Sequence, residues 1–530
     1  MKAAPASPLR VVWGRSHVWL PTAGEAERLD RDARERAGVP ERVLMENAGR
    51  SAALLLQSMH PEGIVVAAVG PGNNGGDALV LLRTLRAWGR EVRWLPTGAR
   101  EPEAALAHGF ELPRVEEQAD SAFAAAGVIV DGMLGTGARG APRGGVPAII
   151  AALNGSGRPV LALDLPSGVD PDTGEIPGES EGRPAAAAAV RADVTVCFGW
   201  PKRGLLRPPG RARCGRIMAV EIGFPPSGDA ASAQAITPAW ALERLPARAF
   251  GTHKYEAGSV LVVAGRSGMG GAAVLAARSA MRAGAGLVRV ASSEANRLLI
   301  QEAVPDALFV PREDGEAFGR AAASADAVVA GPGMGTSAED GEALRALLEA
   351  TPGVPTVLDA DALTLLGAEG GAVAAAAAGR PLVLTPHPGE FGRIWSGGSA
   401  AAKADPVQAA REFAAEIGGT LLLKGAPSVV ARDGAPVLVD AGGSSDFAKA
   451  GMGDHLAGLV GGLLAQGAEP RDAAGVALGV SSLAALWIGA GRGLSPADLA
   501  EAIAPVMVAE PPRQPEPAFP FVLFDQAPPR

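Results

Sequence analysis

The glycine-rich stretch at residues 447–458, Phe-Ala-Lys-Ala-Gly-Met-Gly-Asp-His-Leu-Ala-Gly, combines residue types that could transfer a phosphoryl group. Glycines on both sides of Met452 allow successive backbone N–H groups to point into one concavity. An apolar run begins at Leu456, so this concavity opens onto the N-terminus of a predicted helix, which favours a phosphate. The carboxylate of Asp454 would then take the proton from a hydroxyl that attacks the phosphoryl group. The alternative is a glycine-rich loop in which Asp454 only caps the helix.

Three polar loops in the first half each follow a predicted strand, at residues 70–77, 131–140 and 164–174. Because the carboxyl ends of parallel strands share one edge of a sheet, Asn74, Asp131 and Ser167 would meet there. Amide, carboxylate and hydroxyl oxygens are hard ligands suited to an alkali or alkaline-earth cation. The alternative is that Asp131 and Asp164 only cap the turns in which they lie.

Five loops in the second half also end predicted strands, at residues 265–271, 331–335, 359–361, 385–390 and 424–428. His387 lies between two prolines that restrict its backbone, so it is a candidate ligand contact, with a structural role as the alternative. Lys424 directly follows an apolar run. Its ammonium could reach a nucleotide phosphate, which we favour, or extend from the end of the sheet into solvent.

Short apolar runs predict the sheet that positions the first set of loops. They occupy residues 64–69, 92–95, 128–130, 160–163, 194–198 and 217–220 and alternate with alanine-rich helical stretches. Continuous apolar strands separated by helices indicate a parallel sheet covered on both faces. We therefore predict a Rossmann-like α/β/α sandwich, with ligands at the carboxyl ends of the strands.

A second series of strands is predicted at residues 259–264, 327–330, 356–358, 382–384, 420–423, 428–431 and 437–439. The last three lie close together, which favours an antiparallel hairpin at the edge of an α/β sheet. Residues 226–238 have the composition of a linker between a domain at 20–225 and a domain at 239–508. Residues 1–19 and the Pro-rich residues 509–530 are predicted to be tails, with residues 519–524 able to dock on a domain surface.

Bulk properties exclude several classes of protein. A chain of 530 residues is too long for one core, and its net charge of −9 argues against a nucleic-acid partner. No run of 18 apolar residues is free of charges and helix breakers, so we expect no membrane span. Cys197 and Cys214 are the only cysteines, which favours a reducing compartment. We expect a cytoplasmic enzyme.

Five motifs of the first half resemble those of the NAD(P)H-hydrate epimerase family. They lie at residues 44–49 (Leu-Met-Glu-Asn-Ala-Gly), 73–77, 131–137, 164–170 and 198–204, and the resemblance covers roughly residues 20–225. It implies interconversion of the R and S forms of NADH or NADPH hydrated at C6 of the nicotinamide ring. It also makes Asp164 the candidate acid/base, with Lys202 lowering its pKa. A carbinolamine carbon epimerises through ring opening or an iminium, and one carboxylate can shuttle the proton.

The same resemblance implies the ligand residues. It assigns the hydrate to Asn73, Asn74, Gly75, Gly76, Asp77, Gly135, Thr136, Gly137, Ala138, Arg139, Gly140, Ala141 and Asp164. It assigns a potassium ion to Asn74, Asp131 and Ser167. One departure is Ala78, where the family's loop often carries glycine, and we expect its methyl group to crowd the pocket slightly.

The second half resembles the ribokinase-like fold and, more narrowly, the ADP/ATP-dependent NAD(P)H-hydrate dehydratase family. The motifs lie at residues 253–255 (His-Lys-Tyr), 264–271, 331–335, 358–363 (Leu-Asp-Ala-Asp-Ala-Leu), 385–390 and 424–428, within roughly residues 240–505. The implied reaction is phosphoryl transfer to the C6 hydroxyl followed by loss of phosphate, with Asp454 as the base. The amides of residues 450–453 would stabilise charge on the transferring phosphoryl group.

This second resemblance implies its own ligand residues. It assigns the hydrate to Ala272, Gly333, His387 and Asp454. It assigns ADP or ATP, with Mg²⁺, to Lys424, Gly425, Ala426, Pro427, Ser428 and Gly453. Three positions depart from the family's pattern, which usually has Thr or Ser at Met452, an aliphatic residue at His455 and an Asn-Pro pair at Ser444-Ser445. Met452 removes a hydrogen-bond donor, and we expect it to add bulk near the phosphates.

These observations favour a bifunctional metabolite-repair enzyme, in which the first half supplies the epimer that the second half accepts. Its partners would be NADH or NADPH hydrate, an adenine nucleotide and further copies of itself in a homo-oligomer. One alternative is an ordinary small-molecule kinase, for example of a hydroxymethyl-pyrimidine. Another is a non-catalytic binding module in the first half, or a second half inactivated by Met452 and His455. The presence of Asp164, Lys424 and Asp454 argues against the non-catalytic alternative.

Overall fold

The computed structural model describes residues 17–98, 110, 112–116, 118–180, 182, 184–225, 231–367, 371–508 and 521–529. These residues divide into two compact units. We call residues up to 233, together with 521–529, the first unit, and residues 234–508 the second unit. Each unit contains a mainly parallel sheet with helices, so the predicted α/β class is confirmed for both halves.

The first unit contains, within its described residues, a sheet of seven strands in the order β17-β6-β5-β4-β3-β1-β2. The strands are β1 (Val65–Val69), β2 (Val92–Pro96), β3 (Val128–Gly132), β4 (Val160–Leu163), β5 (Val194–Phe198), β6 (Arg216–Val220) and β17 (Val522–Gln526). Strands β1 to β6 are parallel, and β17 runs antiparallel to β6 at the edge. The chain passes from β1 to β2 on one side and continues from β3 on the other. This reversal creates a crevice at the carboxyl ends of β1 and β3.

Helices cover both faces of this first sheet. They are α1 (Ala23–Glu35), α2 (Glu41–Met59), α3 (Asn73–Ala87), α4 (Ala119–Ala125), α5 (Val146–Gly155), α6 (Pro177–Ser180) and α7 (Ala185–Ala188). Ala67 and Val130 share one core with residues of α2 and α3, whereas Ala68 and Ile129 share the other with residues of α4 and α5. Burial on both faces explains why these strands are continuous apolar runs.

The second unit contains a sheet of ten strands among the residues described, in the order β10-β9-β8-β11-β12-β13-β14-β15-β16-β7. The strands are β7 (Ala233–Ile236), β8 (Ser259–Val263), β9 (Leu287–Ser292), β10 (Leu308–Pro311), β11 (Ala327–Ala330), β12 (Thr356–Leu358), β13 (Leu382–Leu384), β14 (Thr420–Leu423), β15 (Val429–Arg432) and β16 (Val437–Asp440). The sheet is parallel from β10 to β14, and its order reverses between β8 and β11. Strands β14, β15 and β16 pair antiparallel, as the hairpin prediction requires, but β7 and not β16 lies at the edge.

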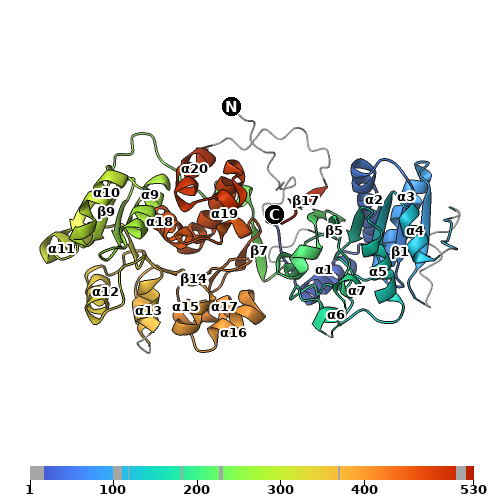
Figure 1. Cartoon of the computed structure of the whole chain (residues 1–530), viewed down its shortest axis with the longest axis horizontal. Helices are drawn as coiled ribbons and strands as arrows, with labels where there is room; N and C mark the ends of the chain where they lie inside the picture. Colours follow the sequence, from blue (N-terminus) through green and yellow to red (C-terminus); the bar gives the residue numbers. More distant parts are fainter. Residues whose placement is uncertain are drawn as a thin grey trace. The chain divides into compact units, whose positions relative to one another are not determined.

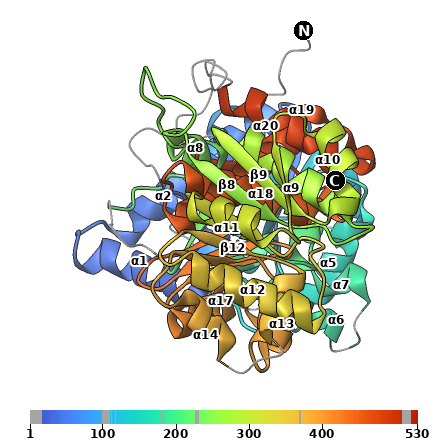
Figure 2. The same cartoon turned by 90° about the vertical axis from the view of Figure 1, so that its left-hand side faces the viewer.

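Helices α9, α18, α19 and α20 cover one face of this second sheet, and α12, α13, α15 and α17 cover the other (Figures 1 and 2). The helices are α8 (Pro238–Glu243), α9 (Gly270–Arg282), α10 (Arg297–Ala303), α11 (Gly315–Ala323), α12 (Ala338–Ala350), α13 (Asp361–Gly367), α14 (Ala372–Ala377), α15 (Pro388–Ile394), α16 (Gly398–Ala404), α17 (Pro406–Ile417), α18 (Met452–Ala465), α19 (Pro470–Ile488) and α20 (Pro496–Val508). Among the described residues, α19 is the one helix long and apolar enough to cross a membrane. It packs in the hydrophobic core of the second unit, where 61% of its most apolar 18-residue stretch is buried.

Two strands lie in segments that the sequence predicts to be a linker and a tail. β7 falls inside residues 226–238 and adds to the second sheet, while residues 226–230 lie outside the described part of the chain. β17 falls inside residues 509–530 and adds to the first sheet, although Phe519 lies outside the described residues. β9 and β10 are also absent from the prediction, because Arg289 interrupts the apolar pattern of β9 and β10 is short and partly exposed. These strands lack the continuous apolar pattern by which the others are recognised.

Candidate functional site

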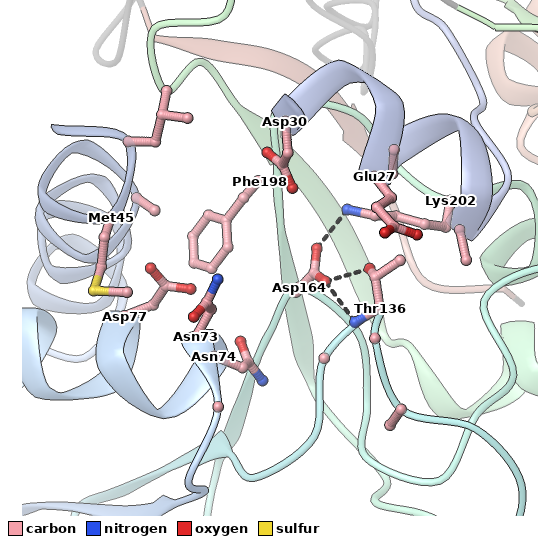
Figure 3. Close-up of a pocket in the computed structure, with 18 of the residues that line it drawn as sticks. Glu27, Asp30, Met45, Asn73, Asn74, Asp77, Thr136, Asp164, Phe198 and Lys202 are labelled. Atoms are coloured by element: carbon pink, nitrogen blue, oxygen red, sulfur yellow. Dashed lines mark hydrogen bonds and ion pairs between the residues drawn. The ribbon is translucent and has the colours of Figure 1, made fainter. Parts of the chain in front are cut away.

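A pocket of about 540 Å³ lies at the carboxyl edge of the first sheet (Figure 3). Helices α1, α2 and α3 and the segments that follow β1, β3, β4, β5 and β6 form its walls. Its lining includes the predicted residues Asn73, Asn74, Asp77, Gly135, Thr136, Gly137, Ala138, Arg139, Asp164 and Lys202. The predicted residues Gly75, Gly76, Gly140 and Ala141 are not part of that lining. The structure therefore brings most of the predicted first-half residues together.

Asp164 follows β4 directly and has a φ of +64°, which is unfavourable for a residue with a side chain and indicates a functional constraint. Lys202 Nζ lies 2.5 Å from Asp164 Oδ1. The hydroxyl and the backbone N–H of Thr136 donate to Asp164 Oδ2 over 2.5 and 3.0 Å. Figure 3 shows Lys202 and Thr136 on one side of this carboxylate, with Asp77 and Asn73 on the opposite side.

The pKa values of the two buried aspartates of the pocket, Asp164 and Asp77, are shifted in opposite directions. Burial alone would raise the pKa of Asp164, but the Lys202 ammonium and the hydrogen bonds from Thr136 outweigh burial and lower it. Burial alone would lower the pKa of Lys202, and the charge of Asp164 outweighs it and raises that pKa. Burial, followed by the charges of Asp164 and Asp30, raises the pKa of Asp77 well above its usual value. Asp164 is therefore the carboxylate held in its ionised form.

The three predicted cation ligands are linked through one hydrogen-bond network. Ser167 Oγ donates to Asp131 Oδ1 over 2.7 Å and accepts from the backbone N–H of Leu134. The amide nitrogen of Asn74 donates to the carbonyl of Leu134, and Asn74 Oδ1 is buried without a hydrogen-bond partner among the described residues. Burial raises the pKa of Asp131 to about 6, against the hydrogen bonds from Ser167 and Met133. An orphaned amide oxygen, linked through Leu134 to a hydroxyl and a carboxylate, fits a hard cation of low charge.

Close backbone contacts explain the glycines of these loops. A Cβ at Gly70 would lie 1.9 Å from the carbonyl oxygen of Met133, and one at Gly75 would lie 1.8 Å from that of Gly70. The prediction that Ala78 crowds the pocket is wrong. Ala78 is fully buried outside the lining, and its methyl group packs toward Gly132.

One wall of the pocket is apolar and was not predicted as part of the site. It is formed by Phe198, Trp200, Ile222 and Phe224. The Phe224 ring packs against Gly199, where a Cβ would lie 2.3 Å from the ring. Such a wall suits a flat ring. Phe198 and Trp200 lie in the motif at residues 198–204, which could have indicated them, whereas no sequence pattern indicates Ile222 or Phe224.

In the second unit, Asp454 lies in the first turn of α18. The N-cap of this helix is Gly451, with a φ of +86° and no side-chain capping bond, so the alternative that Asp454 only caps the helix is wrong. Gly458 lets α18 approach α9 closely, because a Cβ there would lie 2.1 Å from the carbonyl oxygen of Ala276. The packing thus fixes a helix N-terminus, suited to an anion, beside a carboxylate.

Lys424 does not stand alone at the end of β14. Its ammonium lies 2.6 Å from Asp359 Oδ1, and Asp359 is 1% exposed. A Cβ at Gly453 would lie 3.2 Å from Lys424 Nζ and 3.4 Å from Asp359 Oδ2, so the ion pair lies beside the start of α18. Ala360, next in the chain, has a φ of +49°. The partner of Lys424 was not predicted, although Asp359 lies in a motif of the sequence.

Asp454 has a markedly perturbed environment. Burial raises its pKa to about 6, and the charges of Asp359 and Asp361 add to this while Lys424 opposes it. A carboxylate with a pKa near 6 is ionised at neutral pH and still basic enough to accept a proton in a reaction.

Two of the other predicted hydrate residues of the second unit, Ala272 and Gly333, lie at the β8–β11 switch point. A Cβ at Gly333, which has a φ of +56°, would lie 3.3 Å from Cβ of Ala272. The following loop is held by Asp361, which accepts the backbone N–H of Gly335 over 2.9 Å. Arg312 also fixes this loop, because its side chain donates a hydrogen bond to the carbonyl of Met334 over 2.7 Å.

His387 has a structural role in addition to any contact with a ligand. Its Nδ1 accepts the backbone N–H groups of Gly389 and Glu390, and Glu390 bonds back to the N–H of His387, which completes a capping box for α15. The ring is largely exposed, and its Nε2 lies 3.5 Å from Glu390.

The residues that depart from the family's pattern differ in their environment. Met452 is partly buried and packs against the hydrophobic core of the second unit, and its bulk near the phosphates stays a prediction. His455 is 1% exposed, and its ring nitrogens lie 2.8 Å from Ser279 Oγ and 3.2 Å from Ser481 Oγ. Burial lowers the pKa of His455 to about 4, so the ring is neutral and satisfied.

The remaining predicted nucleotide residues form a turn after β14. The backbone N–H of Gly425 donates to Ser428 Oγ over 3.1 Å, and the Ala426-Pro427 bond is cis. Ser444, where an Asn-Pro pair is usual, accepts the backbone N–H of Asp446 over 3.1 Å.

Comparison with known proteins matches both halves of the chain. The family described as YjeF-related protein N-terminus matches residues 41–204, and the family described as NAD(P)H-hydrate dehydratase matches residues 260–505. Three curated relatives share the name bifunctional NAD(P)H-hydrate repair enzyme Nnr. The one from Gloeobacter violaceus is 37% identical and aligns over 90% of this chain and 95% of its own. Those from Salinibacter ruber and Escherichia coli are 35% and 33% identical, over 88% and 89% of this chain and 92% and 89% of their own.

Among solved structures, the second half matches an ADP/ATP-dependent NAD(P)H-hydrate dehydratase from Bacillus subtilis co-crystallised with ATP/Mg²⁺. The two are 29% identical, the match covers 51% of this chain and 96% of that one, and the TM-score is 0.44.

Proposed function

Because the chain belongs to the family of bifunctional NAD(P)H-hydrate repair enzymes, we propose that its two sites act in sequence on one damaged cofactor. The first site interconverts the R and S forms of NADH or NADPH hydrated at C6 of the nicotinamide ring. The second site dehydrates the S form at the expense of ADP or ATP. The observation that carries the proposal is the presence, in one chain, of an ionised carboxylate in a pocket at the edge of one sheet and a basic carboxylate at a helix N-terminus.

In the first pocket, Asp164 would move the proton to and from the C6 oxygen of the hydrate. Ring opening needs this transfer when the C6–N1 bond breaks and again when the ring closes on the other face, and the iminium route needs it when water leaves and returns. Lys202 keeps Asp164 ionised between turnovers, and Thr136 fixes the orientation of the carboxylate. Phe198 and Phe224 offer the ring an apolar surface.

A potassium ion in the first unit would be held by Asn74, Asp131 and Ser167. The fit rests on the buried Asn74 Oδ1, which has no hydrogen-bond partner among the described residues, and on the hydrogen bonds that link Asn74 through Leu134 to Ser167 and Asp131. When bound, the ion would supply positive charge that offsets the buried Asp131 carboxylate.

In the second site, Asp454 would accept the proton of the C6 hydroxyl as its oxygen attacks the terminal phosphoryl group of the nucleotide. The bond from that phosphorus to the nucleotide breaks. The C6–O bond then breaks and phosphate leaves, while a proton is lost from C5 to solvent, so that the C5–C6 double bond of the dihydronicotinamide is restored. The N–H groups at the start of α18 and the Lys424 ammonium would stabilise negative charge on the phosphoryl group. Mg²⁺ would bind mainly through the nucleotide phosphates, and Asp361 offers a carboxylate oxygen of the kind that it prefers.

The test is to incubate the purified protein with separated R and S hydrates, with and without ADP or ATP. Without nucleotide, we expect each epimer to give a mixture of both and no gain in the absorbance of dihydronicotinamide. With nucleotide, both epimers should be converted to NADH or NADPH. Accumulation of a stable phosphorylated hydrate, or no reaction of either epimer, would contradict the proposal.

A further inference from the structure

The C-terminal strand β17 completes the first sheet beside one wall of the first pocket. It pairs antiparallel with β6, with Val522 opposite Val220 and Gln526 opposite Ile217. Val522 and Phe524 are 3% and 0% exposed, so the strand is integrated in the unit and not merely resting on its surface.

Polar contacts at both ends fix this pairing. Arg216, the first residue of β6, binds Asp525 through two hydrogen bonds of 2.6 and 2.5 Å, the bidentate geometry that most restricts both partners. Arg211 donates to the carbonyl of Ala527 over 2.6 Å. At the other end, the backbone N–H of Glu221 donates to the carbonyl of Phe521 over 2.7 Å.

The segment that β17 holds leads directly into the pocket. Ile222 and Phe224, which follow β6, line the apolar wall, and Val522 shares a hydrophobic core with Ile222 and Phe198. The side-chain amide of Asn47, in α2, donates a hydrogen bond to the carbonyl of Ile222 over 2.9 Å. On the outer side, among the described residues, β17 is the neighbour of β6. Both β6 and β17 lie outside the two segments that the family models match.

We propose that β17 is a positioning element of the first pocket, which sets the place of Ile222 and Phe224 through β6 and so controls binding of the nicotinamide ring. Asp525 and Phe521 act as positioning residues, since neither lines the pocket. The activity part of this inference rests on the proposed function of the first pocket. The Asp164–Lys202 pair comes from other elements, so loss of β17 should weaken substrate binding more than the chemical step.

The experiment compares the full chain, Asp525→Ala, Asp525→Glu and a chain that ends at residue 520. For Asp525→Ala and the shortened chain, we expect the KM of epimerisation to rise about tenfold with kcat changed less than about twofold, as loss of roughly one good apolar contact implies. Dehydration of the S form, measured on the same chains, should be unchanged. Asp525→Glu should restore most of the affinity, and a synthetic peptide of residues 521–530 should restore the shortened chain where a scrambled peptide does not. Glu91→Ala, which removes the exposed ion pair with Arg93, is the matched control and should change nothing.

Hydrogen exchange of residues 216–224 in the same variants separates this inference from the proposed function. Faster exchange in Asp525→Ala supports the positioning role even if the full chain epimerises no hydrate, a result that would overturn the proposed function alone. Unchanged exchange and unchanged KM in both Asp525→Ala and the shortened chain would overturn the inference. An equal loss of both activities would also overturn it, because it would indicate general unfolding.

Discussion

Each unit pairs a lysine with a buried aspartate at the end of a strand, but the two pairs differ in the carboxylate that they leave for chemistry. Lys202 binds Asp164, the candidate acid/base itself, over 2.5 Å. Lys424 binds Asp359 over 2.6 Å and leaves Asp454, the candidate base, without a direct ion pair among the described residues. Accordingly, the pKa of Asp164 lies below its usual value, whereas that of Asp454 rises to about 6.

The same pairing of a lysine with a buried aspartate therefore serves two different electrostatic purposes. In the first unit the lysine keeps the candidate acid/base carboxylate ionised despite burial. In the second, burial raises the pKa of Asp454, and the like charge of the aspartate beside the lysine raises it further. Backbone strain accompanies both pairs. Among the described residues other than glycine, positive φ values occur at Asp164 and Ala360, and Ala360 directly follows Asp359.

The largest expected effects come from removing each reactive carboxylate in turn. Asp454→Asn should lower dehydration by about 10²- to 10⁴-fold, because the base is lost, and should leave epimerisation intact. Asp164→Asn should have the opposite effect. Absorbance of the dihydronicotinamide and chromatography of the two epimers measure the activities separately, so each variant is the control for the other. Loss of both activities in either variant would contradict the assignment of one base to each unit.

Replacing each of the two lysines should affect the two reactions in different ways. Lys202→Met leaves Asp164 buried without its counter-charge, so its pKa should rise and epimerisation at neutral pH should fall about tenfold or more. Lys424→Met should chiefly raise the KM for the nucleotide. Steady-state kinetics of both reactions on both variants check this. Equal kcat losses with no change in any KM would show that the lysines play the same part.

The pH dependence of the two activities should sharpen the contrast within one unmodified chain. Asp454 must be ionised to accept a proton, so kcat/KM of dehydration should fall about tenfold per pH unit below its pKa of about 6. Epimerisation should keep its rate through this range, since the pKa of Asp164 is below its usual value. Profiles of both reactions between pH 5 and 8 provide the measurement, and superimposable acid limbs would contradict the difference.

The smallest expected effect concerns stability in the second unit. The folded pKa of His455 is lowered to about 4, so below pH 6.5 the unfolded chain binds a proton that the folded chain excludes. Stability from this group is therefore complete above pH 6.5 and is lost as the pH falls toward 4. The loss should be on the order of 2 kcal/mol by pH 4.5. His455→Gln should flatten this decline in urea unfolding followed across pH, and an unchanged slope would show that other groups cause it.

The sequence predicted the fold class and most of the first pocket because strong local patterns carry them. Parallel strands buried on both faces are continuous apolar runs, and the loops after them concentrate glycine, asparagine and aspartate. Pairing across long distances leaves no local pattern. The Asp359–Lys424 ion pair joins residues 65 positions apart, and Arg216 meets Asp525 across 309 positions. The direction of side chains is likewise absent from the local pattern, since His455 turns into the core from a helix whose first turn faces the site.

The position of β17 has a consequence for the synthesis of the protein. A ribosome releases residues in order, and the last strand of the first sheet spans Val522–Gln526, after the whole second unit. The first unit therefore emerges early with the edge of β6 still uncovered, and it reaches its final form only after the second unit has been synthesised. A gene cut between the two halves would yield an N-terminal fragment that never receives this strand.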